Sequence, residues 1–452
     1  MIAPARAAAY DVLREVSTGA ADLPAALALV RERLVDDRDR ALAAEIAAGV
    51  LRWRAALDHL IVHYAKRPLE RLDPEIVEIL RLGGYQLLHL TRVPASAAVD
   101  DAVSMARRAK KASAAGLVNA VLCAVSRARP ALPLPPRPAD PSNRRAALAY
   151  LAVSLSHPRW LVERWLDRLG FERTERWLQF DNAAGPLTLR ANRLRATRHE
   201  VAARLADEGV ATEPGRFGPD ALLVLQGAAL RSRAFREGLF VVQDEASQLV
   251  PLLAGPAPGP RVLDACASPG GKTTALAALM GDAGLLVACD VRVRRIDLLR
   301  RTLAASGAAG VRVVQADLRR SLPFPTLFDT VLVDAPCSGL GTLRRDPDIR
   351  WRRAEGDLPS LAAAQLVMLQ QAAGVVRPGG RLIYATCSSE PEENEGVAGA
   401  FLAGHPTFRH VDARLAAPAL APGLADARGH LRTAPDEHSL EAFFGAIFER
   451  TR

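Results

Sequence analysis

Two cysteines in the C-terminal half of the chain stand within four residues of the ends of short apolar runs, where catalytic side chains are often found. Cys337 lies in DAPCSG after the run 328–333, and Cys387 lies in ATCSS after the run 381–385. The carboxyl ends of parallel strands meet at one edge of a sheet, so neighbouring strands would bring both thiols to one pocket. Because a thiolate is a strong nucleophile, the pattern indicates covalent catalysis.

A carboxyl group completes the candidate set, since Asp334 stands three residues before Cys337. Carbon 5 of a pyrimidine becomes nucleophilic only after a thiolate adds to carbon 6, and a carboxyl group hydrogen-bonded at N3 stabilises the electron flow. A base must later remove the proton from carbon 5, and the thiol must leave. We expect the pKa of the attacking thiol to be lowered by nearby cationic groups, while the residues alone leave open which thiol attacks.

The stretch 261–274, RVLDACASPGGKTT, predicts a strand, a glycine turn and the start of a helix. Such a turn lets bare backbone N–H groups approach a nucleotide or nucleoside. A P-loop would need glycine where Cys266 stands, which argues against a triphosphate and an NTPase. A nicotinamide enzyme would normally show GxGxxG, which the turn lacks. The expected ligand is therefore another nucleoside cofactor.

Two further apolar runs carry acids at their ends. Asp290 follows the run 285–289, about twenty residues past the glycines, where an acid can bind a ribose diol. Asp317 follows the run 311–315. Repeated strands with polar C-terminal ends predict a doubly wound, mostly parallel α/β sheet, with a nucleoside held at one edge.

The rest of the chain predicts several domains. Apolar residues recur at helical spacing over residues 1–130, which favours an all-α domain, and a stiff proline-rich linker follows over 131–143. Residues 144–235 predict a small α+β connecting domain, and residues 236–452 the catalytic α/β domain. Trp160, Trp165 and Trp177 are candidates either for stacking on RNA bases or for the core of the connecting domain.

The net charge of the 452-residue chain is +9, which favours a polyanionic partner. Residues 102–139 contain no acid, so we expect this segment to contact phosphates. Its cationic residues are Arg107, Arg108, Lys110, Lys111, Arg127, Arg129 and Arg137. The five cysteines form no disulfide or zinc pattern and suit a reducing cytoplasm, and no apolar run is long enough to cross a bilayer. We therefore expect a cytoplasmic protein without metal or membrane.

Three stretches of the C-terminal half resemble the Sun family of S-adenosylmethionine-dependent RNA cytosine-5 methyltransferases: DACASPGGKT, VLVDAPCSGLGTLRRDPDIRW and LIYATCSSEPEENE. Three N-terminal stretches resemble the RNA-binding NusB domain: DRALAAEIAAGVLRWRAALDHLI, RLGGYQLLHLTRVPASAAVDDAV and GLVNAVLCAVSR. The resemblance implies a Rossmann-like methyltransferase domain and S-adenosylmethionine as cofactor. It implies a cytosine of 16S ribosomal RNA as substrate, free or in an early small-subunit assembly intermediate.

The resemblance also implies roles for single residues. The residues near the cofactor would be Cys266, Ala267, Ser268, Pro269, Gly270, Gly271, Lys272, Asp290 at the ribose, Asp317 by the adenine and Asp334 near the methionine end and the base. Cys387 would be the nucleophile, and Cys337 would assist release of the methylated product. DNA cytosine methyltransferases attack from a Pro-Cys motif like Pro336-Cys337, so the reversed assignment stays open.

The chain departs from the family pattern at two places. Ser268 stands where alanine is usual, a change between small residues that should be harmless, and Glu441-Ala442 stands where Asp-Gly is usual, which puts the final hairpin in doubt. The main alternatives are a non-catalytic RNA-binding assembly or antitermination factor, and a methyltransferase that acts on another RNA such as tRNA. We expect a monomer in either case.

Overall fold

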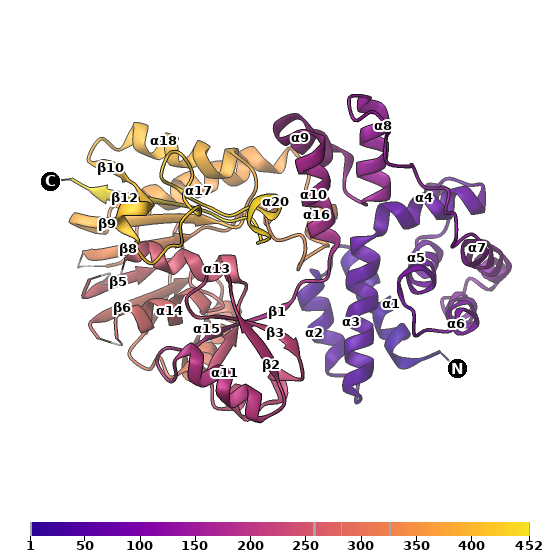
Figure 1. Ribbon diagram of the computed structural model, residues 1–452, viewed down its shortest axis with the longest axis horizontal. Coiled ribbons are helices and arrows are strands. Elements are labelled where there is room, and N and C mark those ends of the chain that lie inside the picture. Colours follow the sequence, from indigo (N-terminus) through magenta and orange to yellow (C-terminus); the bar gives the residue numbers. More distant parts are fainter. Residues whose placement is uncertain (1, 256–258, 282, 325–326, 452) are drawn as a thin grey trace. The chain divides into compact units, whose positions relative to one another are not determined.

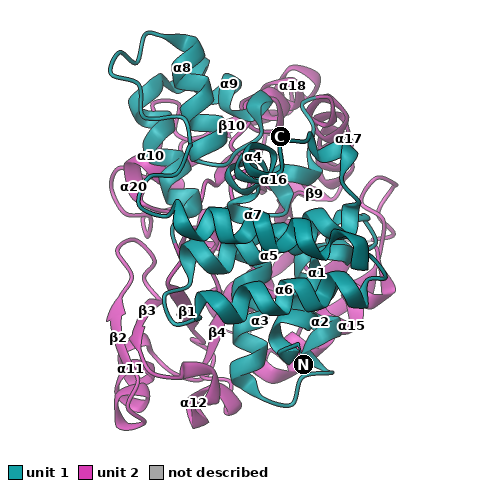
Figure 2. Cartoon of the chain, turned by 90° about the vertical axis from the view of Figure 1, so that its right-hand side faces the viewer, with its two compact units in different colours: residues 1–183, 343–355 teal, residues 184–342, 356–452 magenta. Residues whose placement is uncertain are grey.

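The computed structural model describes residues 2–255, 259–281, 283–324 and 327–451 (Figure 1). The chain forms two compact units, which Figure 2 shows in different colours. Unit 1 is Met1–Ala183 with Leu343–Glu355, and unit 2 is Ala184–Thr342 with Gly356–Arg452. The predicted connecting segment 144–235 thus has residues in both units. The predicted domain borders at 130, 143 and 235 stay predictions.

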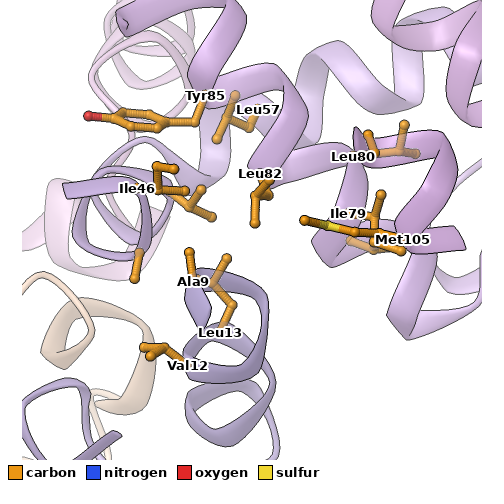
Figure 3. Packing of buried hydrophobic residues seen from close by; sticks show 14 of the residues in the cluster. Ala9, Val12, Leu13, Ile46, Leu57, Ile79, Leu80, Leu82, Tyr85 and Met105 are labelled. Atoms are coloured by element: carbon orange, nitrogen blue, oxygen red, sulfur yellow. The ribbon is translucent and has the colours of Figure 1, made fainter. Parts of the chain in front are cut away.

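The N-terminal part of unit 1 is entirely helical, as predicted. Its α-helices are α1 (Pro4–Ser17), α2 (Leu23–Arg31), α3 (Asp37–Arg52), α4 (Arg54–Ala65), α5 (Pro74–His89), α6 (Ala95–Arg108) and α7 (Ala115–Arg127). The side chain of Asp22 accepts a hydrogen bond from the backbone N–H of Ala25 and so caps α2. Figure 3 shows the apolar core, where Leu13, Ile46 and Leu82 pack together from α1, α3 and α5.

The remaining helices of unit 1 are α8 (Arg144–Ala149), α9 (Arg159–Leu169), α10 (Phe171–Asn182) and α16 (Ile349–Arg352). Trp165 and Trp177 are buried, and their ring centroids lie 5.1 Å apart. Stacking on RNA bases is therefore wrong for these two tryptophans, which belong to the core. The proline-rich segment is held in place, because the carbonyl of Pro135 accepts a hydrogen bond from the hydroxyl of Ser154 at 2.6 Å.

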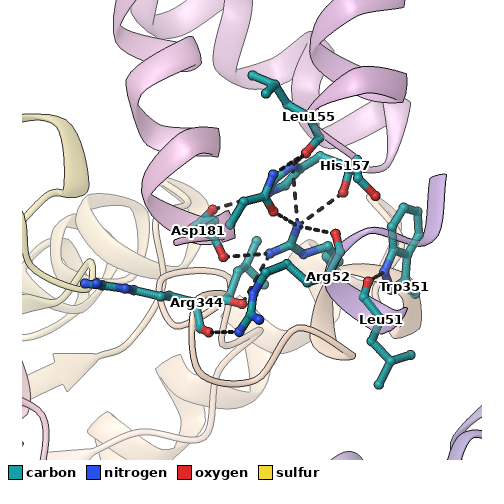
Figure 4. Close-up of polar contacts among 11 residues, drawn as sticks. Leu51, Arg52, Leu155, His157, Asp181, Arg344 and Trp351 are labelled. Carbon is teal, nitrogen blue, oxygen red and sulfur yellow. Dashed lines mark hydrogen bonds and ion pairs between the residues drawn. The ribbon is translucent and has the colours of Figure 1, made fainter. Parts of the chain in front are cut away.

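Residues 343–355 complete unit 1, although they follow the Cys337 motif in the sequence. The side chain of Arg350 is 0% exposed and donates hydrogen bonds to the backbone carbonyls of Ser156 and Asp181. The indole N–H of Trp351 donates to the backbone carbonyl of Leu51 on α3 at 2.6 Å (Figure 4). These contacts bind the segment into the helical unit through buried, directional bonds.

Unit 2 contains a small antiparallel sheet with the strand order β2-β3-β1-β4. Its elements are β1 (Leu187–Ala191), α11 (Arg198–Asp207), β2 (Ala211–Pro214), β3 (Ala221–Gln226), α12 (Arg233–Arg236) and β4 (Phe240–Val242). α11 begins with a capping box, in which the side chain of Thr197 and that of Glu200 each bond the other's backbone N–H. The mixture of strands and helices expected of an α+β domain is thus found here.

The second sheet of unit 2 has eight strands in the described residues, in the order β10-β12-β9-β8-β5-β6-β7, with β11 paired to β12. The strands are β5 (Arg261–Asp264), β6 (Leu285–Asp290), β7 (Arg312–Gln315), β8 (Phe328–Asp334), β9 (Val376–Thr386), β10 (Phe408–Val411), β11 (Leu431–Arg432) and β12 (Phe444–Arg450). The strands β7, β6, β5, β8 and β9 pair in parallel, and β12 is antiparallel to β9. The predicted mostly parallel sheet is confirmed.

Helices cover both faces of this sheet (Figure 1). They are α13 (Glu245–Leu249), α14 (Gly271–Leu279), α15 (Val293–Ser306), α17 (Asp357–Ala373), α18 (Val397–Gly404), and the short helices α19 (Ala413–Ala416) and α20 (Pro435–His438). Val262 of β5 packs in one apolar cluster with Leu299 of α15, and Leu263 packs in another with Leu369 of α17. Alternate strand residues therefore face opposite layers, as in a doubly wound fold.

The two sheets of unit 2 are tied together by buried polar groups. Arg190 of β1 donates a hydrogen bond to the hydroxyl of Thr274 on α14 at 2.5 Å, and burial lowers the pKa of Arg190 to about 10. Asn192, just after β1, donates to the backbone carbonyl of Ser306 at the end of α15 at 2.7 Å. The small sheet is thereby fixed against the helix that follows the glycine turn.

Among the described residues, no helix combines the length and the apolar composition that a membrane crossing requires. Nor do three or more histidine, cysteine, aspartate or glutamate side chains of this part of the chain gather in a way that could hold a metal ion.

Candidate active site

The two predicted thiols meet at one edge of the parallel sheet. β8 and β9 are neighbours, with Asp334 opposite Ala385, so the segments that follow them begin side by side. The Sγ atoms of Cys337 and Cys387 lie 3.2 Å apart, within hydrogen-bond distance, and both cysteines are thiols rather than a disulfide. Both residues are partly buried. The convergence expected from the strand order is therefore found.

The pKa of Cys337 is raised well above its ordinary value, because its thiol is hydrogen-bonded to Cys387 and buried, and because the charge of Glu393 lies nearby. Cys337 thus lacks the lowered pKa expected of an attacking thiol. It is a protonated group next to Cys387, able to donate a hydrogen bond to that sulfur.

A charged pair stands beside the thiols. The Nζ atom of Lys272, on the first turn of α14, lies 2.6 Å from Oδ2 of Asp334 at the end of β8. Burial alone would lower the pKa of Lys272, but the Asp334 carboxylate outweighs burial and raises it. The ammonium group also lies 5.6 Å from the centroid of the Phe443 ring, a cation–π distance.

The glycine turn joins β5 to α14. Gly270 has φ +109°, a conformation that favours glycine, and a Cβ atom there would lie 3.0 Å from Leu299 Cδ1. The hydroxyl of Ser268 donates to the backbone carbonyl of Arg295 at 3.0 Å. Pro269 and Gly271 complete the turn, and α14 begins at Gly271. The first backbone N–H groups of α14 are therefore available to a ligand.

Under the turn lies a buried carboxyl group. Asp264 is 0% exposed and accepts a hydrogen bond from the hydroxyl of Thr273 at 2.7 Å. Burial raises the pKa of Asp264 to about 7. Burial and the neighbouring acids raise the pKa of Cys266 well above its usual value, so this thiol is neutral. Ala267 continues the chain to the turn, and its N–H donates to the carbonyl of Cys289 at 2.8 Å.

The other two predicted acids lie at the same edge of the sheet, Asp290 as the last residue of β6 and Asp317 two residues after β7. Asp290 is buried, and its Oδ1 accepts a hydrogen bond from the backbone N–H of Arg292 at 3.3 Å. Asp317 is paired with Arg319 at 2.9 Å, and hydrogen bonds from that residue lower the pKa of Asp317 to about 2. Asp290 lies on the strand next to β5 and its charge acts on Cys266, whereas Asp317 follows β7, one strand further along the sheet.

Family models match three parts of the chain. The 16S rRNA methyltransferase RsmB/F model matches residues 251–449, the NusB family model residues 3–127, and an RsmF/B-like ferredoxin-like domain residues 157–231. A ribosomal RNA small subunit methyltransferase B of Pseudomonas putida is 37% identical over 412 residues, covering 90% of this chain and 91% of that protein. The chain belongs to the ribosomal RNA small subunit methyltransferase B family.

A second curated relative carries the same family name, and one solved structure has a similar fold. A probable ribosomal RNA small subunit methyltransferase B of Bacillus subtilis is 34% identical over 382 residues, covering 84% of this chain and 83% of that protein. The crystal structure of PH0851 is 27% identical, with a TM-score of 0.80, and the match covers 100% of this chain and 99% of that one. The resemblance to a NusB domain joined to an RNA methyltransferase domain is thereby confirmed.

The structure adds a buried pair of residues that the sequence analysis of this methyltransferase B family member missed. Glu393 and Asn394 lie on a π-helical turn, η6 (Glu392–Gly396), inside the EPEENE stretch. Asn394 donates to the carbonyl of Ser388 at 2.9 Å and accepts from the hydroxyl of Thr386 at 2.5 Å. The polar stretch that follows the Cys387 motif was visible in the sequence. The burial of Glu393 and Asn394 could not be predicted from it.

The second departure from the family pattern leaves the last strand intact. Ala442 donates its backbone N–H to the carbonyl of Gly341 at 2.9 Å, and a Cβ atom on Gly341 would lie 2.1 Å from the Ala442 carbonyl oxygen. β12 follows and pairs antiparallel with β9. The doubt about the final hairpin of this methyltransferase B chain is resolved, since the chain packs closely against the segment after Cys337.

Two of the seven cationic side chains in the basic segment 102–139 form ion pairs within the protein. Lys111 pairs with Asp73 at 2.8 Å, and Arg137 pairs with Glu175 at 2.8 Å. Folding thus brings an acid from a distant part of the sequence to each of these two cations, while the prediction that the segment contacts phosphates stays a prediction. The exposed remainder is Arg107, Arg108, Lys110, Arg127 and Arg129.

Proposed function

We propose that the protein transfers a methyl group from S-adenosylmethionine to carbon 5 of a cytosine in 16S ribosomal RNA, through a covalent bond between Cys387 and the base. The observation that carries the proposal is the distance of 3.2 Å between the sulfur atoms of Cys337 and Cys387 at the edge that also bears Lys272 and Asp334. The names of the related ribosomal RNA methyltransferases support the substrate class.

The chain's own groups suit each step of this reaction. Cys387 loses its thiol proton to solvent as it bonds to carbon 6 of cytosine, and the electron density that moves to N3 takes up a proton from the Lys272 ammonium group, which Asp334 holds in place. Carbon 5 would then bond the methyl group while the donor leaves as a neutral thioether. Loss of the carbon 5 proton to a solvent base would release Cys387, and the N3 proton would return to Lys272. When the bond between Cys387 and carbon 6 breaks, the raised pKa of Cys337 makes it a protonated neighbour that hydrogen-bonds the departing sulfur.

The donor set at the sheet edge fits a nucleoside cofactor. Asp290 offers a carboxylate for a ribose diol, and Gly270 and Gly271 let the backbone approach closely. The neutral thiol of Cys266 adds no charge, and the residues that would line the site further are Ala267, Ser268, Pro269, Lys272, Asp317 and Asp334. When bound, S-adenosylmethionine supplies an electrophilic methyl group.

The thiol variants test the proposal directly. Cys387→Ala should abolish methyl transfer from labelled S-adenosylmethionine, because no bond to carbon 6 can form. Cys337→Ala should instead leave a protein–RNA adduct that is visible on a denaturing gel. Cys123→Ala, a helix-surface change in unit 1, is the control and should leave both readouts unchanged. An adduct that appears only with Cys387→Ala would reverse the thiol roles, and full activity of Cys387→Ala would disprove the mechanism.

The target base must leave its stack to reach the thiols, so we propose an unpaired cytosine, in free 16S RNA or in an early assembly intermediate of the small subunit. Bisulfite mapping of ribosomal RNA from a deletion strain should show the loss of one 5-methylcytosine. Comparing naked RNA with isolated precursor particles in the same assay identifies the preferred form. We also propose that the enzyme acts as a cytoplasmic monomer, which gel filtration and cell fractionation would test.

A further inference from the structure

Glu393 is a fully buried carboxylate between the two thiol-bearing segments, with an exposed fraction of 0%. Its Oε1 accepts a hydrogen bond from the backbone N–H of Ser338 at 2.8 Å, and its Oε2 accepts from the hydroxyl of Ser388 at 2.5 Å. Ser338 directly follows Cys337, and Ser388 directly follows Cys387. A single side chain therefore bonds the residue after each thiol.

A third partner fixes the direction of this carboxylate. Gln365 of α17 donates its amide N–H to Oε1 of Glu393 at 2.8 Å and to the carbonyl of Pro336 at 3.0 Å. The hydroxyl of Tyr384 contacts Gln365 Oε1 at 3.0 Å and the backbone carbonyl of Glu393 at 2.5 Å. The network thus holds the residues on both sides of Cys337, and it leaves Glu393 little freedom to rotate.

Burying a carboxylate is costly unless several donors compensate it, and here three donors converge on one group. The hydroxyls of Ser338 and Ser388 also contact each other at 3.1 Å, so the two segments meet directly above the carboxylate. Two further contacts join the same segments, this hydroxyl pair and the backbone N–H of Gly341, which donates to the carbonyl of Cys387 at 3.0 Å. Glu393 adds a buried side chain that bonds the residue directly after each thiol, and it thereby helps to fix the separation of the two sulfur atoms.

We propose that Glu393 is a positioning residue, whose carboxylate holds the Cys337 segment and the Cys387 segment in register so that their sulfur atoms stay within hydrogen-bond distance. Its effect on catalysis rests on the proposed function. Glu393 itself acts through Ser338 and Ser388 rather than on the base.

Two substitutions separate the reach of the side chain from its charge. Glu393→Asp keeps the charge but is one methylene shorter, so it cannot bond both Ser338 and Ser388. Glu393→Gln keeps the length, and its amide oxygen can accept from Ser338 and Gln365 while its NH₂ group donates to Ser388. Glu392→Asp, the same change on the preceding residue, is the matched control.

Under the proposal, Glu393→Asp lowers kcat for methyl transfer by about 10–100-fold, with calorimetric affinity for S-adenosylmethionine unchanged. Glu393→Gln stays within about fivefold of the parent, because its hydrogen bonds hold the same segments. Glu392→Asp behaves as the parent. Thermal unfolding of each variant confirms that the fold is retained. Parent-like kcat for Glu393→Asp, or an equal loss for Glu393→Gln, would overturn the proposal.

A second readout needs neither RNA nor cofactor. Separating the thiols removes the hydrogen bond that the Cys337 thiol donates to Cys387, which is the largest cause of the raised pKa of Cys337. Iodoacetamide at pH 8 should then alkylate Cys337 roughly tenfold faster in Glu393→Asp than in the parent, as measured by peptide mass spectrometry. An unchanged rate contradicts the positioning role. A faster rate in a protein that methylates no RNA would keep the positioning role and reject the proposed function.

Discussion

The ammonium group of Lys272 lies 2.6 Å from the carboxylate of Asp334, and the two side chains are only 14% and 24% exposed. One comes from the glycine turn that opens α14, and the other from the end of β8. The pair therefore joins the predicted cofactor site to the predicted base site. Removing either partner leaves a charge that is largely shielded from water, which is costly.

Asp334→Asn should lower the single-turnover rate of methyl transfer by roughly 100-fold, because N3 of the base loses a charged partner. Lys272→Met should cause a similar loss, and the double variant should lose no more than either single variant, since the two groups act as a unit. Rapid-quench assays with labelled S-adenosylmethionine measure this. Additive losses would show that the two residues work independently.

Asp264 should make the stability of the protein depend on pH. Its pKa is about 7 in the folded chain and near 3.9 in an unfolded one, so the folded state holds the extra proton between these values. The contribution of this group to the free energy of unfolding is largest below pH 4 and is lost as the pH rises toward 7.

Asp264→Asn should remove this dependence. Between pH 4 and pH 7 the free energy of unfolding should fall in both proteins, but the fall should be smaller in the variant by roughly 2–4 kcal/mol. Urea unfolding at several pH values measures the difference. Asp207→Asn, an exposed change on α11, is the control and should run parallel to the parent. Parallel curves for Asp264→Asn would contradict the prediction.

Arg350 should be a main determinant of the stability of unit 1. Arg350→Met should lower the free energy of unfolding by roughly 3 kcal/mol, because the buried carbonyls of Ser156, Asp181 and Leu343 lose their donor. Arg159→Met removes only an exposed ion pair with Glu163, so it should cost less than about 0.5 kcal/mol. Urea titration followed by tryptophan fluorescence compares the two, and equal losses would argue against the buried role.

The exposed cations of the basic segment should set the salt dependence of RNA binding. Replacing Arg107, Arg108 and Lys110 together by alanine should reduce the slope of log K against log salt by about 2, since three phosphate contacts are lost. Replacing Lys111 and Arg137, which are already paired with acids, should change the slope much less. Filter binding over a range of salt concentrations would decide, and an equal change in both variants would reject the distinction.

The sequence predicted the catalytic sheet well because its evidence is local. Each apolar run with a polar end marks one strand, and parallel order then brings Cys337 and Cys387 together. The motif that carries Glu393 was visible, but the burial of its carboxylate depends on Gln365, which comes from another helix. Likewise, the acid that neutralises Lys111 lies 38 residues away in the sequence. Tertiary packing determines such partners, and a short stretch of sequence does not reveal it.

The helical unit is encoded in two separated pieces of the gene, because residues 343–355 supply Arg350 and Trp351 to helices formed by residues 1–183. A chimaera that replaces only residues 1–183 by those of a relative would combine a foreign helical bundle with the original segment 343–355. Arg350 would then lack the backbone carbonyls to which it donates hydrogen bonds in this chain. We therefore expect that a functional exchange of the helical unit must transfer residues 1–183 and 343–355 together, unless the new bundle can bind the original segment 343–355.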